Sequence, residues 1–166
     1  MNININDLNF RNSVKHTDIS TITEILQSTE YFYDYEIEVA ADLAKEYLKT
    51  GTKSGYNFLF AENNKGIVAG YVCYGPIACT VSSFDLYWIA VHKNFQKLGL
   101  GKILLVKTEE LIKSAGGKQI YIETSNSLKY ISTRSFYLKC GYIQEAVLKN
   151  FYGPGDDKVI YSKHNL

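Results

Sequence analysis

The chain has 166 residues, of which 46% are hydrophobic, and its 18 basic and 17 acidic residues leave a net charge of +1. This length and composition are ordinary for a globular protein and favour one domain over residues 1–166. The nearly neutral charge gives no electrostatic reason to expect a nucleic acid or an anionic membrane as a partner.

Cysteine and histidine usage argues against disulfides and metal sites. The three cysteines are odd in number and show no CxxC spacing, so a reducing compartment is the simplest interpretation. The three histidines are scattered and lack the spacing of metal ligands, so we expect no metal. These residues are Cys73, Cys79, Cys140, His16, His92 and His164.

Neither the N-terminal segment nor the longest apolar stretch has the features of a signal peptide or a membrane span. Residues 1–7 lack the basic start and the apolar centre of a signal peptide. The longest apolar stretch, 67–81, is interrupted by glycines and a proline, which makes it too short and too broken to span a bilayer. We therefore expect a soluble protein of the cytoplasm.

Hydrophobic periodicity predicts alternating strands and helices. Apolar residues recur at helical spacing from Ile19 to Leu26, and a turn-forming run at 63–66 separates two β-rich segments. In chain order we expect a strand at 10–15, helices starting at 16–18 and spanning 37–49, strands at 56–62, 67–74 and 83–91, a helix at 100–115, a strand at 118–123, a helix at 131–139, and strands at 142–151 and 158–163. This order predicts an α/β fold with a mixed sheet and helices on both faces.

The segment 86–102 carries the clearest functional pattern. A strand ends, a loop with Gly99 and Gly101 follows, and a helix begins. Free N–H groups at a helix start, together with the helix dipole, form an anion site, and glycine lets a phosphate approach the backbone. Lys97 and Lys102 would add positive charge. The alternative is a strand-to-helix turn that needs glycine for geometry alone. Neither GxxxxGK[ST] nor GxGxxG is present.

Two segments resemble one known family. Residues 96–101, Gln-Lys-Leu-Gly-Leu-Gly, resemble the Q/R-x-x-G-x-G/A signature of the Gcn5-related N-acetyltransferases (GNAT). Residues 136–142, Phe-Tyr-Leu-Lys-Cys-Gly-Tyr, are similar to the family's FYxxxGF segment. The order of elements from Phe10 to Lys163 also matches. The resemblance implies a single GNAT-like domain with a mixed, mostly antiparallel sheet of about seven strands and about four helices.

The same resemblance implies acetyl-CoA as co-substrate and direct transfer to a primary amine in a ternary complex. Backbone amides of the 96–101 loop, with Lys102, would bind the CoA pyrophosphate. The preceding strand end would pair with pantetheine, and an N–H near Ile89 or Val91 would polarise the thioester carbonyl. The implied cofactor-binding residues are Ile89, Ala90, Val91, Gln96, Lys97, Leu98, Gly99, Leu100, Gly101 and Lys102.

The resemblance also assigns an acid. Tyr137 would protonate the departing CoA thiolate, and the alternative is a tyrosine packed in the core. Many family members carry asparagine seven residues earlier, where this chain has Tyr130. The nearest asparagine, Asn126, lies about one turn too early, which leaves that cofactor contact open. Cys140 has no clear histidine partner in the sequence, so a ping-pong mechanism is not expected.

The amine needs a base as well. A lysine-like amine has a pKa of about 10.4, so its free-base form costs about 4.6 kcal/mol at pH 7. Asp85 and Glu123, on or beside strands, are the candidate bases, and each could equally be structural. In the family the first two helices shape the acceptor pocket, which here corresponds to 30–38 with Tyr31, Tyr33 and Asp34. An exposed helix start is the alternative interpretation of that segment.

Other functions stay open at this stage. The acceptor could be a small-molecule amine or a peptide amine. An inactive acyl-CoA-binding sensor or interaction domain, or an acyltransferase with another acyl donor or a hydroxyl acceptor, would share the same loop. The oligomeric state is also open, with a homodimer as one alternative.

Overall fold

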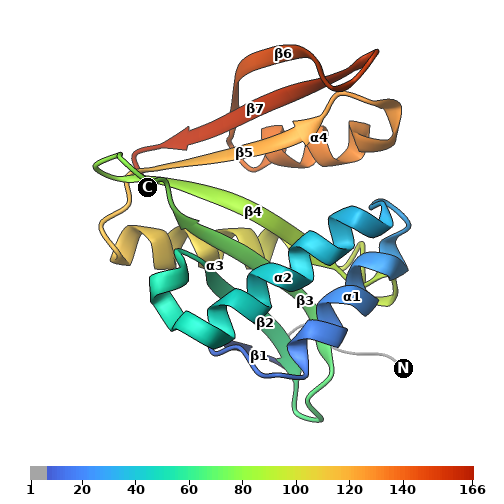
Figure 1. Ribbon diagram of the computed structural model, residues 1–166, viewed down its shortest axis with the longest axis vertical. Coiled ribbons are helices and arrows are strands. Elements are labelled where there is room, and N and C mark those ends of the chain that lie inside the picture. The colour runs from blue at the N-terminus through green and yellow to red at the C-terminus, as the bar shows by residue number, and fades with distance from the viewer. Residues whose placement is uncertain (1–6) are drawn as a thin grey trace. The chain divides into compact units, whose positions relative to one another are not determined.

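The computed structural model describes residues 7–166, so most of the segment considered for a signal peptide lies outside the described residues. The elements in chain order are β1 (Leu8–Arg11), α1 (Asp18–Thr29), α2 (Asp34–Thr50), β2 (Asn57–Asn63), β3 (Val68–Pro76), β4 (Ser83–Val91), α3 (Leu100–Ser114), β5 (Gln119–Ser125), α4 (Ile131–Lys139), β6 (Ile143–Gly153) and β7 (Asp156–His164). Short 3-10 turns, η2 (Gly51–Ser54), η3 (Lys93–Phe95) and η4 (Leu128–Tyr130), lie between them. Figure 1 shows these elements.

The strands follow the order β1-β2-β3-β4-β5-β7-β6. The β1–β2, β2–β3, β5–β7 and β6–β7 pairs are antiparallel, whereas β4–β5 is parallel. The predicted mixed, mostly antiparallel sheet of seven strands with four helices is therefore confirmed. Within residues 7–166, no helix combines the length and the apolar character that crossing a bilayer requires.

The chain divides into two compact units. The first contains the residues up to Gly75 together with Trp88–Thr108, and the second contains Pro76–Tyr87 and Glu109–Leu166. Strand β4 and helix α3 contribute residues to both. The organisation of 1–166 as one domain stays a prediction.

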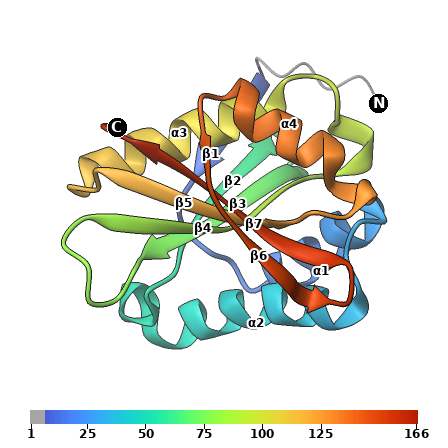
Figure 2. The same ribbon diagram turned by 90° about the horizontal axis from the view of Figure 1, so that it is seen from above.

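In the first unit, helices cover both faces of the strand layer. Helices α1 and α2 bury apolar residues such as Ile22 and Ile37 against Phe58 and Tyr71 of β2 and β3. Figure 2 shows α2 and the first part of α3 on opposite sides of these strands. Gly70 permits the close approach of β4 and α3, because a Cβ there would lie 2.8 Å from the carbonyl oxygen of Ala90 on β4 and 3.1 Å from Leu104 of α3.

In the first unit, two element starts differ by two residues or more from the sequence-based prediction, and in the second unit β7 starts at Asp156 rather than at 158. Strand β1 was expected at 10–15 but covers Leu8–Arg11, because Arg11 turns its guanidinium onto Asp18 at 2.6 Å and Glu62 at 2.7 Å. Helix α2 begins at Asp34 rather than at 37. Its first turn is stabilised by the Glu36 carboxylate, which accepts a hydrogen bond from the Tyr33 N–H at 2.8 Å.

In the second unit, α4 packs against one face of the strands β5 and β7. Tyr137 of α4 has its ring centre 5.9 Å from that of Tyr161 on β7 and 5.9 Å from that of Tyr142. Strand β6 forms the edge of the sheet and is largely exposed. Its pairing with β7 shifts register twice, between Gln144 and Ala146 and between Leu148 and Gly153. Such irregularities blunt an edge strand against pairing with another chain.

A buried hydroxyl in the first unit gives a stability prediction. The Tyr71 hydroxyl is fully buried and finds no hydrogen-bond partner in the described part of the chain. Tyr71→Phe should raise the free energy of unfolding by about 1 kcal/mol, because it removes an unsatisfied polar group. Tyr142→Phe should lower it by about 1.5 kcal/mol, because the Tyr142 hydroxyl donates to Glu109 at 3.0 Å. Urea unfolding of both variants checks the sign. Destabilisation by Tyr71→Phe would contradict the prediction.

Candidate functional site

The loop between β4 and α3 is held in shape by its own hydrogen bonds. His92 N–H donates to the carbonyl of Ala69 at 2.9 Å, which anchors the loop to β3. The Gln96 side-chain amide donates to the carbonyl of Val91 at 3.0 Å, so the loop folds back on the end of β4. The rings of His92 and Phe95 pack with centroids 5.6 Å apart. The first residue of the predicted cofactor motif therefore has a structural role.

The backbone of the loop then presents a row of unpaired donors. Lys97 and Gly99 have positive φ angles of 63° and 84°. Within residues 7–166, no acceptor is found for the backbone N–H groups of 97–101, whereas Lys102 N–H and Ile103 N–H donate to the Gly99 carbonyl. Residues that alternate between left-handed and right-handed backbone conformations at a helix start form a concave turn whose N–H groups bind anions. The geometry fits a phosphate group.

Two lysine side chains add charge to this turn. Lys97 and Lys102 are both exposed, and neither forms an ion pair with a residue in the range 7–166. Their charges are therefore available to an anion. Ala90 is buried, and Ile89 and Val91 are half-buried, so the predicted pantetheine-pairing residues lead directly into the loop. The structure thus brings together the predicted cofactor-binding residues within the first unit.

Tyr137 lies in a cluster of aromatic rings in the second unit. Phe136, Tyr142 and Tyr161 surround its ring, with centroids within 5.9 Å. Burial, and then the nearby Cys140, raise the pKa of the Tyr137 phenol above its ordinary value. No residue in the range 7–166 forms a hydrogen bond with its hydroxyl. A phenol in this setting stays protonated at neutral pH and can donate to a ligand.

The two candidate bases lie on neighbouring strands of the second unit. Asp85 of β4 pairs in register with Tyr121 of β5, and Glu123 is two residues further along β5. Because side chains alternate along a strand, Asp85 and Glu123 share one face of the sheet. Burial, and then the charge of Glu123, raise the pKa of Asp85, while the ammonium of Lys158 lowers it. The structure therefore brings Asp85 and Glu123 together.

The acid and the bases lie on opposite faces of this strand layer. Glu123 pairs with Ile160 of β7, and the neighbouring position Ile122 pairs with Tyr161, whose ring contacts Tyr137. Alternation places Glu123 and Tyr161 on opposite faces. The parallel β4–β5 pairing spans Ser83–Asp85, and no pair beyond Asp85 and Tyr121 is found in the second unit as described.

Lys158 is a functional candidate that sequence reasoning missed. Its Nζ lies 2.5 Å from Glu123 Oε2 and 3.6 Å from the centre of the Phe151 ring. In the sequence, Lys158 is only a lysine at the start of an expected strand, 158–163. Lysine side chains are usually exposed, so nothing there indicates a buried ion pair. The contact with Glu123 depends on the pairing register of β5 and β7, which the sequence does not reveal.

At position 130, where many family members carry an asparagine, this chain has a tyrosine. Tyr130 ends the short η4 turn immediately before α4. Asn126 is engaged elsewhere, since its side chain hydrogen-bonds with the Asp157 carboxylate and its backbone N–H donates to the Asp157 carbonyl at 2.8 Å. Arg134 of α4 donates to the carbonyls of Ser125 and Ser127 at 2.8 and 2.9 Å. Arg134 therefore ties α4 to the end of β5.

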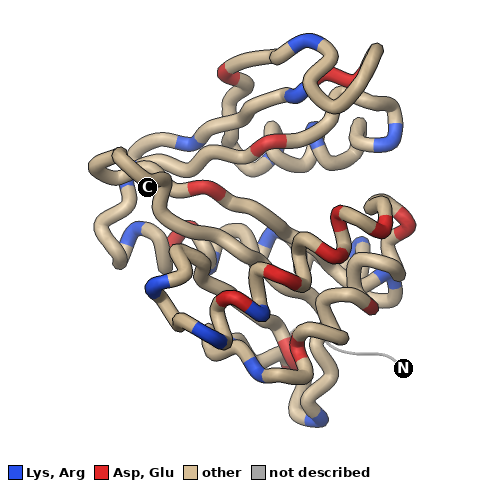
Figure 3. The backbone as a smooth tube through the Cα atoms, in the orientation of Figure 1, with Lys and Arg blue, Asp and Glu red and all other residues tan. Residues whose placement is uncertain are grey.

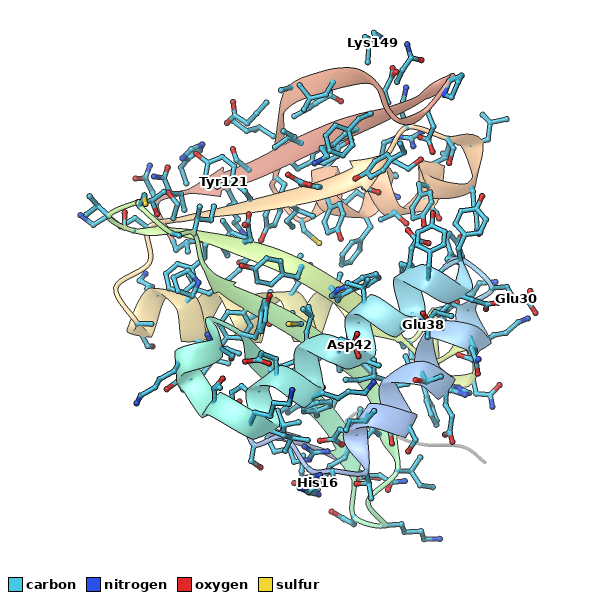
Figure 4. All side chains as sticks on the ribbon, in the orientation of Figure 1. His16, Glu30, Glu38, Asp42, Tyr121 and Lys149 are labelled. Carbon is cyan, nitrogen blue, oxygen red and sulfur yellow. The ribbon has the colours of Figure 1, made fainter. Side chains whose placement is uncertain are left out.

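The predicted acceptor segment, 30–38, spans the start of α2 in the first unit. The ring of Tyr33 is 64% exposed and stacks on Tyr35 at 5.6 Å, Tyr31 is half-buried, and Asp34 is exposed. Figure 3 shows acidic positions following one another through this segment and along α2. Glu38 and Asp42 lie one turn apart on the exposed side of α2 (Figure 4). The arrangement favours cations but does not define a pocket.

Metal ligation has no support in the part of the chain that the structure describes. No group of histidine, cysteine, aspartate and glutamate side chains within residues 7–166 could hold a metal ion. Cys140 is half-buried rather than fully buried, and Cys73 is fully buried.

Comparisons with known proteins agree on one family. A family model described as an acetyltransferase (GNAT) domain matches residues 54–144, a range that includes both the 96–101 and the 136–142 segments. A ribosomal protein bS18-alanine N-acetyltransferase from Haemophilus influenzae is 29% identical over 138 residues, covering 81% of this chain and 88% of the relative.

Solved structures are similar as well. A GNAT-family protein from Desulfovibrio desulfuricans has a TM-score of 0.92 at 41% identity, covering 95% of this chain and 98% of that one. A GNAT family acetyltransferase from Elizabethkingia anophelis, solved with acetyl-CoA bound, has a TM-score of 0.72 at 19% identity, covering 95% of this chain and 98% of that one. At this identity the second likeness concerns the fold alone.

Proposed function

Because this chain belongs to the GNAT acetyltransferase family, we propose that it transfers an acetyl group from acetyl-CoA directly to a primary amine in a ternary complex. The observation that carries the proposal is the row of unpaired N–H groups at 97–101, which stands where a strand passes into a helix. A pyrophosphate supplies the acceptors that these donors lack. Lys97 and Lys102 contribute charge to the same ligand.

The proposed reaction needs no covalent enzyme intermediate. Asp85 or Glu123 takes a proton from the acceptor ammonium, and the nitrogen lone pair then attacks the thioester carbonyl carbon. As the tetrahedral intermediate collapses, the carbon–sulfur bond breaks and its electron pair stays on sulfur. Tyr137 acts as the acid by donating a hydrogen bond to the developing thiolate, and the second proton of the attacking nitrogen passes through solvent to that sulfur. Backbone N–H groups near Ile89 or Val91 stabilise the developing oxyanion.

An N-terminal α-amine is the first acceptor class to test. Its pKa is about 7.7–8.0, so its free base costs about 1 kcal/mol at pH 7, compared with about 4.6 kcal/mol for a lysine side chain. The Haemophilus influenzae relative is named for acetylation of an alanine on a ribosomal protein, which supports the same class and a cytoplasmic location. The carboxylates and rings around Tyr33 and Asp34 would attract such a cation.

The test is thiol release from acetyl-CoA by the purified protein. The panel contains a peptide with a free N-terminal alanine, the same peptide with its N-terminus blocked and one lysine added, and a small polyamine. Release that depends on one of these amines supports the enzyme and identifies its acceptor class. Tight CoA binding without release for any amine would instead favour the sensor alternative. Absence of CoA binding would contradict the proposal.

A further inference from the structure

Lys158 is a buried cation on β7 of the second unit. The residue is 8% exposed, and its ammonium contacts the Glu123 carboxylate at 2.5 Å and the face of the Phe151 ring at 3.6 Å. An ammonium taken out of water is costly unless it is paired. Glu123 and Phe151 therefore explain why a lysine is stable at this buried position.

The contact leaves part of Glu123 available to a ligand. Its side chain is 49% exposed, and its Oε2 lies 2.5 Å from the Lys158 ammonium. Within residues 7–166, no other ion pair or hydrogen bond of this carboxylate is found. A carboxylate that is half exposed and held by a buried cation has a defined position from which it can bind a ligand.

Asp85 stands beside this pair without a partner of its own. Its side chain forms no ion pair or hydrogen bond with residues 7–166, and it is half-buried. Figure 4 labels Tyr121, the β5 residue that pairs in register with Asp85. If all three ionise, Asp85, Glu123 and Lys158 carry a net charge of −1, which suits one acceptor ammonium.

We propose that Lys158 is a positioning residue that gives the two carboxylates different roles. It holds Glu123 in place as the anchor for the acceptor ammonium and leaves Asp85 to accept the proton. In that step one N–H bond breaks, the proton moves to an Asp85 carboxylate oxygen, and the electron pair stays on nitrogen to attack the thioester. The inference rests on the proposed function and goes beyond it by separating anchor from base.

The charges around Asp85 determine whether a substitution raises or lowers its pKa. Burial raises the pKa of Asp85, Glu123 raises it further, and Lys158 lowers it. The charged neighbours that act on Asp85 are Glu123 on β5 and Lys158 on β7, and Tyr121 on β5 pairs with Asp85 in register. Removing the Lys158 charge should therefore raise the pKa of Asp85, and removing the Glu123 charge should lower it.

The test compares pH profiles of kcat/KM. An enzyme that binds the ammonium and then removes its proton loses kcat/KM on the acid side as its base becomes protonated. Lys158→Met should shift this acid limb to higher pH, Glu123→Gln should shift it to lower pH, and Lys158→Arg should keep it near the wild-type position. A loss of folding stability alone would not move the limb in opposite directions.

Lys163→Met is the matched control. Lys163 lies on the same strand and is also paired with a glutamate, Glu109, at 2.8 Å. It lies five residues from Lys158, so strand alternation places it on the other face. Its replacement should leave the acid limb unchanged. An equal shift in this variant would overturn the assignment to Lys158.

A measurement without turnover separates this inference from the proposed function. The side-chain carboxyl carbon of Asp85 can be titrated by NMR in the wild type and in Lys158→Arg, Lys158→Met and Glu123→Gln. The midpoint should rise in Lys158→Met and fall in Glu123→Gln, even if no acceptor is ever acetylated. If Lys158→Met does not fold, Lys158→Gln takes its place, because it removes the charge and keeps a hydrogen-bond donor for Glu123. An Asp85 midpoint that does not rise when the Lys158 charge is removed would overturn the proposal.

Discussion

Replacing Gly99 with aspartate should weaken acetyl-CoA binding on the order of 10²-fold or more, which would make it undetectable at ordinary concentrations. A carboxylate about 5 Å from a bound phosphate, at an effective dielectric constant near 20, costs about 3 kcal/mol per charge pair. The side chain would also occupy the space in front of the N–H groups of 97–101 that the pyrophosphate needs. Within the protein itself nothing lies within 4 Å of a Cβ at this position, so the conflict is with the ligand.

The other end of α3 supplies a matched control. Gly116 has a φ of 85° against 84° for Gly99, and a Cβ there also meets nothing within 4 Å. Aspartate at either position bears the same left-handed strain of about 1–2 kcal/mol. Gly116→Asp should therefore lower the melting temperature about as much as Gly99→Asp while leaving the affinity for acetyl-CoA unchanged.

Titration calorimetry with acetyl-CoA and thermal melting of both variants distinguish a direct effect on ligand binding from a loss of folding stability. Wild-type affinity in Gly99→Asp would remove the phosphate loop from the proposed site. Equal losses of affinity in both variants would attribute the effect to folding stability rather than to the ligand. Gly99→Ala adds a milder case, because it keeps most of the strain and introduces no charge.

The sequence predicted local features of this molecule well. The 96–101 loop could be recognised because its chemistry is contiguous, with glycine at a positive φ and a helix start directly after it. Helix α3 was similarly evident from residues such as Leu100 and Leu104, which share a buried face. These features depend on neighbours in the chain, which periodicity and turn chemistry report directly.

Features that depend on contacts between distant parts of the chain were harder to predict from the sequence. Strand β1 ends early because the Arg11 side chain bonds to Asp18 and Glu62, and Glu62 lies in a distant strand. The Lys158–Glu123 contact likewise requires the register of β5 against β7. A one-residue change of register would turn Lys158 to the other face, so no reading of the chain alone could have found this pair.

Tyr137→Phe should lower kcat by about 10²-fold with little change in the affinity for acetyl-CoA. General acids contribute about 10²–10⁴-fold, and the lower value fits a phenol that donates a hydrogen bond without transferring its proton completely. Because burial raises the pKa of Tyr137, its phenol is a weaker acid than a thiol of pKa about 8.5. Its contribution is therefore to stabilise the negative charge that develops on sulfur. Stopped-flow and steady-state kinetics with a saturating amine measure this loss.

Tyr161→Phe tests whether the loss arises from the hydroxyl at position 137 or from the aromatic cluster. Tyr161 is equally buried, and its ring centre lies 5.9 Å from that of Tyr137. Both variants keep the ring, so packing is retained and each should unfold close to the wild type. Only Tyr137→Phe should lose turnover. A full-rate Tyr137→Phe enzyme would mean that solvent or another group stabilises the developing thiolate. Equal losses in both variants would make the aromatic cluster, and not the Tyr137 hydroxyl, the requirement for catalysis.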